Sequence, residues 1–439
     1  MLNQNSPQRG LNTIHNQKIF FFDYLFVLIL ILYAGGANTF VQSASIKDNQ
    51  VSFIIPILLS IILAIRKKVI FGERFYYLIL GVGIYFLASS IKYQQIHITI
   101  LINFLALFFI VYTVVKALNF NFFKIYEYLI YHLAFIALAL WSIQFILGGD
   151  SLFNVFSKIP GISLFSYVTG HGLNIIIYTI QPAAFFTLDN LGSSIPRNCG
   201  FAWEPGAFAV YLCLAIFINL FITKSEESNR IHFWVLVLAL ITTQSTTGFI
   251  ILLIILSFYY ANKKLNIVFI GLPIIIMAML YVFSLPFMGD KIIHIVNEAN
   301  DMNTIVENSR DNEETENPQR FVSFMIGFQD FIKNPILGIQ GGENESWTEK
   351  IGANISVISG IGDLLAENGL VGFLFFSILS IKSSFYLSKR YNYKGKLLLF
   401  LIILSISISY TIILRPLITC FWMFSFVEPH KIFPKKSFY

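Results

Sequence analysis

Residues 98–115 read ITILINFLALFFIVYTVV and contain no charged side chain. An α-helix rises about 1.5 Å per residue, so a run of this length nearly crosses the roughly 30 Å hydrocarbon core of a bilayer. The chain has 439 residues, of which 56% are hydrophobic and only 12% are charged. Soluble domains carry about 25% charged residues. The sequence therefore predicts an all-α, polytopic integral membrane protein.

Similar apolar runs predict about 12 transmembrane helices, because each helix needs about 17–25 apolar residues. They lie at residues 19–36, 51–65, 75–91, 98–115, 127–147, 206–223, 231–244, 247–262, 267–285, 370–381, 396–414 and 417–428. With a cytoplasmic N-terminus, most of the 30 lysines and arginines fall in cytoplasmic loops or at the termini, as the positive-inside rule requires. Both termini are then expected in the cytoplasm.

This topology divides the chain into five parts. Residues 1–147 form an N-terminal transmembrane bundle, and residues 148–205 form the first long outer segment. Residues 206–285 hold the middle spans, residues 286–369 form the second outer segment, and residues 370–439 contain the last spans and a cytoplasmic tail. The chain has no long cytoplasmic loop and no Walker-type glycine loop, which argues against an ATP-driven pump. Any chemistry is expected on the outer face.

Other features of the composition exclude further classes. The net charge of +6 is explained by topology, so no nucleic-acid partner is expected. The three cysteines are far apart and odd in number, and require no disulfide framework. The seven histidines are scattered, and neither HExxH nor CxxC occurs. We therefore expect no metal site and no cofactor.

Arg320 begins a segment whose apolar residues recur with helical spacing up to Asn334-Pro335. With Asn317 as N-cap and Pro318 at the first helical position, an amphipathic helix is predicted to lie on the membrane surface. A cation in the first turn is unfavourable by about 0.3–1 kcal/mol unless an anion shares the site. Helix-end amides and Arg320 together suggest a phosphate or pyrophosphate clamp. The alternative is a surface arginine that contacts lipid headgroups or the acidic run at 311–316.

Arg197 and Glu204 lie at the end of the first outer segment, just before a predicted span. An arginine and a glutamate at membrane depth suit a site for an anionic lipid-linked sugar. The simpler interpretation is a helix N-terminal cap at Glu204-Pro205 with an interfacial arginine. Asp23, inside the first span, is a weaker candidate because it lies close to the cytoplasmic edge.

Asp363 and Glu367 are spaced i, i+4 and share one helical face just outside the span at 370–381. Two like charges so placed are mildly destabilising. They suit either a solvated edge or a site that holds sugar hydroxyls or orients an arginine. Because both carboxylates point the same way, they give little support for glycoside hydrolysis.

In these residues the chain resembles the O-antigen and capsular polysaccharide polymerases (Wzy-type), in a superfamily that also contains the O-antigen ligases. Four motifs between residues 190 and 375 carry the resemblance. They are Arg197-x-x-Gly200 with Trp203-Glu204-Pro205-Gly206, the Thr/Ser-Gly turn at 242–248, Arg320 with Asn334-Pro335-Ile336-Leu337-Gly338, and Leu364-x-x-Glu367-x-Gly369-Leu370-x-Gly372.

The resemblance implies a GT-C-like, metal-independent glycosyltransferase of the bacterial cytoplasmic (inner) membrane. Its substrate would be an undecaprenyl-pyrophosphate-linked oligosaccharide, and its partners would be membrane lipid, a chain-length regulator and a flippase. Arg197 and Arg320 would stabilise the pyrophosphate leaving group, and Glu204 would orient Arg197 or accept the acceptor proton. Asp363, Glu367, Gly338 and Ser245 would bind substrate.

Two departures from the ligases favour a polymerase. Ligases typically carry a His-Asn pair about nine residues before the glutamate that corresponds to Glu367, where this chain has Ile358-Ser359. They often have an arginine after the serine of the turn motif, where this chain has Thr246. The alternatives are an O-antigen ligase that transfers glycan to a lipid-A core, and a non-enzymatic transporter or flippase. A transporter usually contains repeated halves, and we find no internal repeat.

Overall fold

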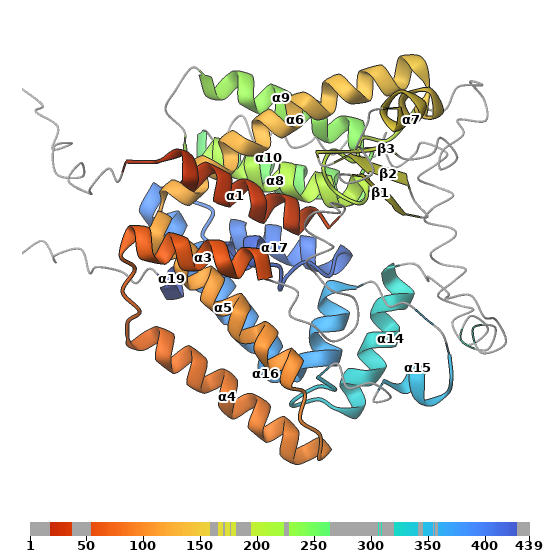
Figure 1. Cartoon of the computed structure of the whole chain (residues 1–439). Helices are drawn as coiled ribbons and strands as arrows, with labels where there is room; N and C mark the ends of the chain where they lie inside the picture. Colours follow the sequence, from red (N-terminus) through yellow and green to blue (C-terminus); the bar gives the residue numbers. More distant parts are fainter. Residues whose placement is uncertain are drawn as a thin grey trace, which may run out of the picture.

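A computed structural model describes residues 18–36, 54–158, 166–169, 172–175, 177–180, 195–223, 228–263, 306, 309, 320–340, 346–353, 355 and 359–427. This part of the chain is mostly helical (Figure 1). The predicted span at 267–285, the helix start at Asn317-Pro318, the acidic run and both termini lie outside the described residues.

Four described helices are long and apolar enough to cross a membrane: α4 (Glu73–Tyr93), α5 (Ile98–Leu118), α6 (Asn121–Leu147) and α16 (Gly360–Tyr391). Shorter apolar helices accompany them: α1 (Phe21–Gly35), α8 (Pro205–Phe221), α9 (Ser228–Thr243), α10 (Thr246–Lys263) and α17 (Leu398–Ser409). The chain is therefore a polytopic membrane protein, although the count of about 12 spans is not confirmed.

Several predicted spans form helices shorter than a bilayer is thick. The run at 51–65 gives α3 (Ile54–Lys67), and the run at 417–428 gives only α18 (Pro416–Trp422) and α19 (Phe424–Val427). Hydropathy measures how apolar a run is, whereas the length of the helix also depends on where its backbone turns.

Helix α8 occupies the centre of the bundle. It packs against α6, α9 and α10, and nearly every residue from Pro205 to Phe221 is buried. A helix that is apolar on every side has no face for water, which explains this position. Its first residues, at the end opposite Phe221, lie at the candidate site described below.

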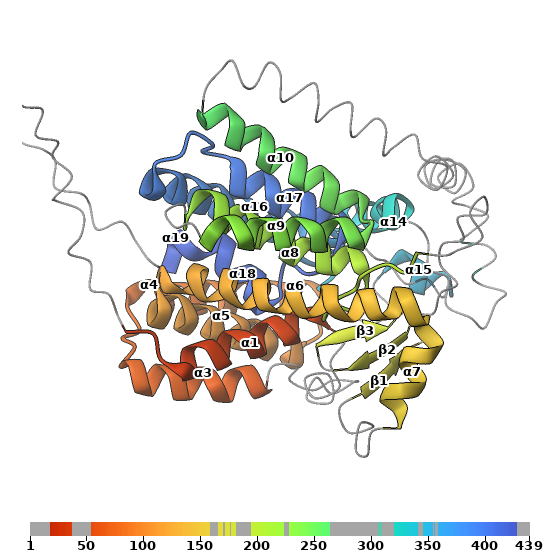
Figure 2. The same cartoon turned by 90° about the horizontal axis from the view of Figure 1, so that it is seen from above.

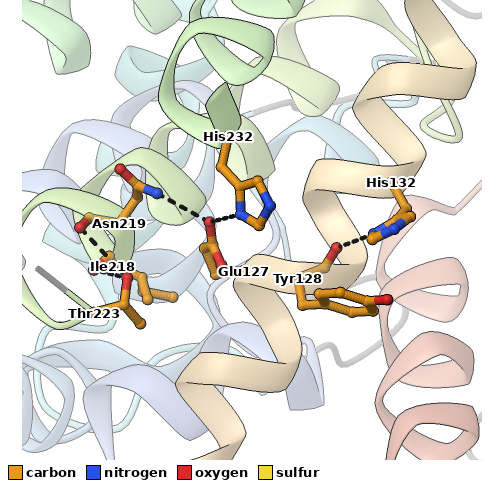
Figure 3. Close-up of polar contacts among 7 residues, drawn as sticks. All are labelled: Glu127, Tyr128, His132, Ile218, Asn219, Thr223 and His232. Atoms are coloured by element: carbon orange, nitrogen blue, oxygen red, sulfur yellow. Dashed lines mark hydrogen bonds and ion pairs between the residues drawn. The ribbon is translucent and has the colours of Figure 1, made fainter. Parts of the chain in front are cut away.

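A polar cluster ties α8 to its neighbours at the other end of the bundle. The Glu127 carboxylate on α6 accepts hydrogen bonds from Asn219 Nδ2 on α8 (3.1 Å) and His232 Nδ1 on α9 (2.9 Å; Figure 3). The Tyr131 ring stacks on His232 with 3.8 Å between ring centroids. Asp23, a weak functional candidate from the sequence, forms a comparable contact with Lys67 Nζ at 2.8 Å. That ion pair joins α1 to α3.

The basic loops gather at one end of the molecule. The Arg390 guanidinium lies over the Phe120 ring at 4.9 Å, and the Lys394 backbone amide donates to Asn262 Oδ1 at 2.7 Å. These contacts bring together the loops after α5, α10 and α16. Figures 1 and 2 place α7 (Gly149–Ser157), α14 (Arg320–Lys333) and α15 (Trp347–Lys350) at the opposite end from α19.

A small sheet departs from the all-α prediction. Strands β1 (Ser166–Thr169), β2 (Gly172–Ile175) and β3 (Tyr178–Ile180) form an antiparallel sheet in that order, with Thr169 opposite Gly172 and Ile175 opposite Tyr178. Two residues separate each pair of strands in the sequence, which is the commonest length for a hairpin connection. From β3, Thr179 N donates to Gly200 O (2.7 Å), and Thr179 Oγ1 donates to Ala202 O (2.8 Å). The sheet thereby supports the segment that carries Arg197 and Glu204.

Candidate functional site

The motif Asn334–Gly338 and the break in α16 form a single interlocked structure. Gly369 is non-helical (φ 60°, ψ −163°), so helix α16 is interrupted there. The segment after α14 provides hydrogen-bond donors for the backbone carbonyls at this break. Ile339 N donates to Ala366 O at 2.8 Å, and Gln340 N donates to Glu367 O at 2.7 Å. On the other side of the break, Leu370 N donates to Pro335 O at 2.8 Å. Two motifs that are separate in the sequence are therefore one structural unit.

Gly338 is part of this interlock. It has a φ of +69°, and a Cβ atom there would lie 2.6 Å from Ala366 O. From α4, Tyr93 donates its hydroxyl to Gly338 O, and Tyr85 donates to Leu337 O at 2.8 Å. The structure thus gives Gly338 a packing role, and its predicted role in substrate binding remains a prediction.

Helix α14 lies where the sequence predicts a helix after Arg320, and one of its faces packs against the protein. Val322, Ile326 and Gly327 are among the buried residues, and the helix packs against α16. A Cβ at Gly327 would come within 3.1 Å of the Gly362 backbone, so glycines allow the two helices to approach closely. The aromatic residues Phe321 and Phe328 are instead exposed. Small residues thus determine which face of α14 contacts the protein, and its position on the membrane surface remains a prediction.

Arg320 is the first residue of α14 and joins three parts of the chain. Its Nη2 donates to Glu204 Oε1 at 2.7 Å, and its Nη1 donates to Ser409 O at the end of α17. Its guanidinium lies 4.4 Å from the centre of the Tyr410 ring. The side chains of Arg320 and Glu204 are 32% and 30% exposed, so a ligand can reach this ion pair.

Arg197 contacts the Thr/Ser-Gly turn rather than Glu204. Its Nε donates to Thr243 O (3.1 Å) and its Nη2 donates to Gln244 O (3.2 Å), at the carbonyl end of α9. A cation is favoured at this end of a helix. The sequence assigned Glu204 to orient Arg197, but the ion pair of Glu204 is with Arg320. Burial is the largest influence on the pKa of Arg197 and lowers it, while nearby acidic groups, including Glu204, oppose that effect.

Three helices begin at this site. Glu204 is the N-cap of α8, with no side-chain cap bond, and Pro205 takes the first helical position. Ser245 caps α10 by accepting a bond from Gly248 N at 3.2 Å. Thr247 Oγ1 bonds to Ser409 Oγ at 2.8 Å, which brings the start of α10 next to the Ser409 carbonyl that Arg320 contacts. Helix N-termini carry a partial positive charge, so with two arginines and one glutamate this region suits an anion.

The predicted substrate-binding residues fall in two places. Ser245 is buried at the turn that Arg197 contacts, so its hydroxyl is used in capping. Asp363 and Glu367 lie on the part of α16 that precedes the break, where Ser359 is the N-cap and accepts from Gly362 N. Within the described residues, neither carboxylate forms an ion pair with an arginine. No ion pair therefore joins either carboxylate to Arg197 or Arg320 within the part of the chain that the structure describes.

Ser409 and Tyr410 are site residues that the sequence analysis missed. They fall inside the run 396–414, which was interpreted only as a span. Tyr410 is 5% exposed, its ring lies under Arg320, and its hydroxyl occupies the space that a Cβ at Gly206 would need. The glycine of Trp203-Glu204-Pro205-Gly206 is thus explained by Tyr410. The sequence does mark this place, because the polar pair Ser409-Tyr410 interrupts the apolar run near its end.

Comparison with known proteins agrees with this geometry. No curated protein matches the chain. A family model described as O-antigen ligase matches residues 231–377, a range that contains the α9–α10 turn, Arg320 and the α16 interlock. This match supports an enzyme. The part of the chain from residue 231 to residue 377 therefore places it with the O-antigen polymerase/ligase superfamily.

Proposed function

We propose that this protein joins undecaprenyl-pyrophosphate-linked oligosaccharide repeat units into O-antigen or capsular polysaccharide. The reaction would take place at the outer face of the bacterial cytoplasmic membrane and release undecaprenyl pyrophosphate. The observation that carries the proposal is the position of Arg320. It is accessible, lies where α8, α10 and α14 begin, and is held by Glu204 and Ser409.

In this reaction, an acceptor hydroxyl attacks the anomeric carbon of the donor glycan. The bond between that carbon and the pyrophosphate oxygen breaks, and negative charge develops on the leaving group. Arginines stabilise such charge by donating hydrogen bonds from a planar fork. A guanidinium has five N–H donors, so Arg320 retains donors for a pyrophosphate oxygen besides those used for Glu204 and Ser409.

Glu204 is our candidate for the group that accepts the acceptor proton. Its carboxylate is 30% exposed and bonds to Arg320. When pyrophosphate binds, it competes for the Arg320 donors, and Glu204 is released to accept a proton from the acceptor hydroxyl. Arg197 holds the α9–α10 turn and adds a second positive charge to the same region.

The residues before Glu367 favour a polymerase over a ligase. Ser359 stands in the region where ligases typically carry their His-Asn pair, and it serves as the N-cap of α16. A ligase that transfers glycan to a lipid-A core is the second candidate, because the matching family model is described as O-antigen ligase. A chain-length regulator and a flippase are proposed partners of the polymerase.

The test is a purified-protein assay with a synthetic undecaprenyl-pyrophosphate repeat unit, with products separated by size. A polymerase produces a ladder of multiples and releases undecaprenyl pyrophosphate. Absence of a ladder, together with transfer to a lipid-A core acceptor, would instead support the ligase. Movement of the lipid-linked unit across vesicles without bond formation would support a transporter.

A further inference from the structure

A cavity of about 200 Å³ lies between the α4–α5 hairpin and the break in α16. On one side it is lined by the apolar residues Phe86, Ile100 and Phe104. On the other side it is lined by three polar residues, Gln340, Glu367 and Asn368. The interlock described above creates this polar wall, because Gln340 bonds to the α16 backbone at Glu367 O.

Two amide groups in this wall lack the partners that buried polar atoms normally have. Asn368 and Gln340 are only 6% and 4% exposed. Within the described residues, neither Asn368 Nδ2 nor Gln340 Nε2 has a partner with hydrogen-bond geometry. Gln340 lies beside the Tyr85 hydroxyl, which donates its one proton to the carbonyl of Leu337 or to that of Asn368. An unsatisfied buried amide costs about 1–3 kcal/mol, which a ligand that accepts hydrogen bonds would offset.

The lining favours one class of ligand. Glu367 accepts hydrogen bonds through its carboxyl oxygens, whereas the two amides donate hydrogen bonds. A neutral group rich in hydroxyls satisfies both, because each hydroxyl is a donor and an acceptor. The Phe86 and Phe104 rings offer an apolar surface to the C–H face of a ring. These properties together describe a sugar ring.

The cavity is distant from the proposed reacting centre. Helix α14 extends from Arg320 to Lys333, which is about 20 Å at 1.5 Å per residue, and Gln340 follows its far end. A sugar in the cavity would therefore belong to a remote part of a glycan whose end reacts at Arg320. We propose that this cavity is a distal subsite that binds one sugar ring of the growing chain and retains the chain between additions. The identity of the glycan rests on the proposed function.

The first experiment measures sugar binding without catalysis. The probes are free D-glucose, D-galactose, D-mannose, N-acetyl-D-glucosamine and N-acetyl-D-galactosamine. Binding is measured by saturation-transfer NMR on the full-length protein in a detergent that lacks a sugar headgroup. We expect at least one sugar to bind, Ile100→Trp to abolish binding by filling the cavity, and Glu367→Gln to weaken it about tenfold. Ile102→Trp, at an exposed position on the same helix, is the matched control and should bind normally.

The second experiment measures product length. Ile100→Trp should shorten the products, while the control Ile102→Trp should give products of wild-type length at a wild-type rate. Arg320→Ala should keep sugar binding while losing polymer formation, so failure of the proposed function is distinguishable from failure of the subsite. Absence of binding by every sugar in the panel, or wild-type binding by Ile100→Trp, would overturn the subsite.

Discussion

Substitution of Gly369 by alanine tests the interlock between α14 and α16. Gly369 has φ 60° and ψ −163°, a combination that is essentially restricted to glycine and costs other residues about 1–3 kcal/mol. The added Cβ would also lie 2.6 Å from Gly338 N and close to Ile336 O. Both neighbours are backbone atoms in a hydrogen-bonded segment, so neither can move alone.

The size of the effect follows from the bonds that must lengthen. Leu370 N–Pro335 O (2.8 Å) and Val371 N–Ile336 O (3.2 Å) cross the break beside Gly369. Each contributes about 0.5–1.5 kcal/mol. With the conformational cost, we expect Gly369→Ala to destabilise the protein by about 2–6 kcal/mol. Because the interlock fixes the far end of α14, activity should fall as well.

Two glycines provide matched controls for this measurement. Gly352 also has a positive φ (+73°) but has no neighbour that a Cβ would meet, so Gly352→Ala should cost only about 1–2 kcal/mol. Gly81 lies within α4 and also has open space, so Gly81→Ala should be neutral or stabilising by about 0.5–1 kcal/mol. The assay is the fraction of detergent-solubilised protein that remains monodisperse after heating. If Gly369→Ala is as stable as Gly352→Ala, the crowding argument is wrong.

Three further substitutions probe individual contacts. Glu127→Ala removes the acceptor shared by Asn219 and His232, and should lower stability by about 1–2 kcal/mol in the same heating assay, while Glu127→Gln should cost less. Tyr410→Leu removes the ring under Arg320. That cation–π contact is worth about 0.5–2 kcal/mol, so the initial rate of polymer formation should fall about 2- to 30-fold. Tyr410→Phe keeps the ring, so its initial rate should fall less. Arg197→Lys cannot make both bonds to the α9–α10 turn and should slow the initial rate about tenfold. If the two Tyr410 variants lose the same rate, the contact between the Tyr410 ring and Arg320 does not matter for activity. If Arg197→Lys keeps the wild-type rate, the two bonds from Arg197 to the α9–α10 turn do not matter for activity.

Hydropathy predicted the membrane class because long runs without charge have no other stable environment. The prediction of individual spans was weaker, since the lengths of α17 and α18 depend on backbone turns at Tyr410 and Arg415. The strands β1–β3 were missed because short strands carry little periodic signal, although glycine at positions 170 and 172 marks a hairpin connection.

For the candidate site, the sequence identified Arg197, Glu204 and Arg320 as residues of interest but not how they pair. Charged residues at membrane depth are conspicuous in a sequence, whereas their partners depend on how helices pack. Arg320 pairs with Glu204, 116 positions away in the chain, because α14 packs on α16 and α16 packs on α17, at whose end Ser409 O accepts from Arg320. Backbone partners such as Ser409 O carry no sequence signal.

The most direct test of the account measures release of undecaprenyl pyrophosphate by Arg320 variants. Wild type, Arg320→Ala, Arg320→Lys and the control Lys333→Ala, which removes a cation from the far end of the same helix, are compared at equal amounts of folded protein. Loss of one group that stabilises developing charge typically costs about 10²–10³ in rate. We predict a loss of that size for Arg320→Ala, partial recovery in Arg320→Lys and a wild-type rate for Lys333→Ala. A wild-type rate of release by Arg320→Ala would contradict the account.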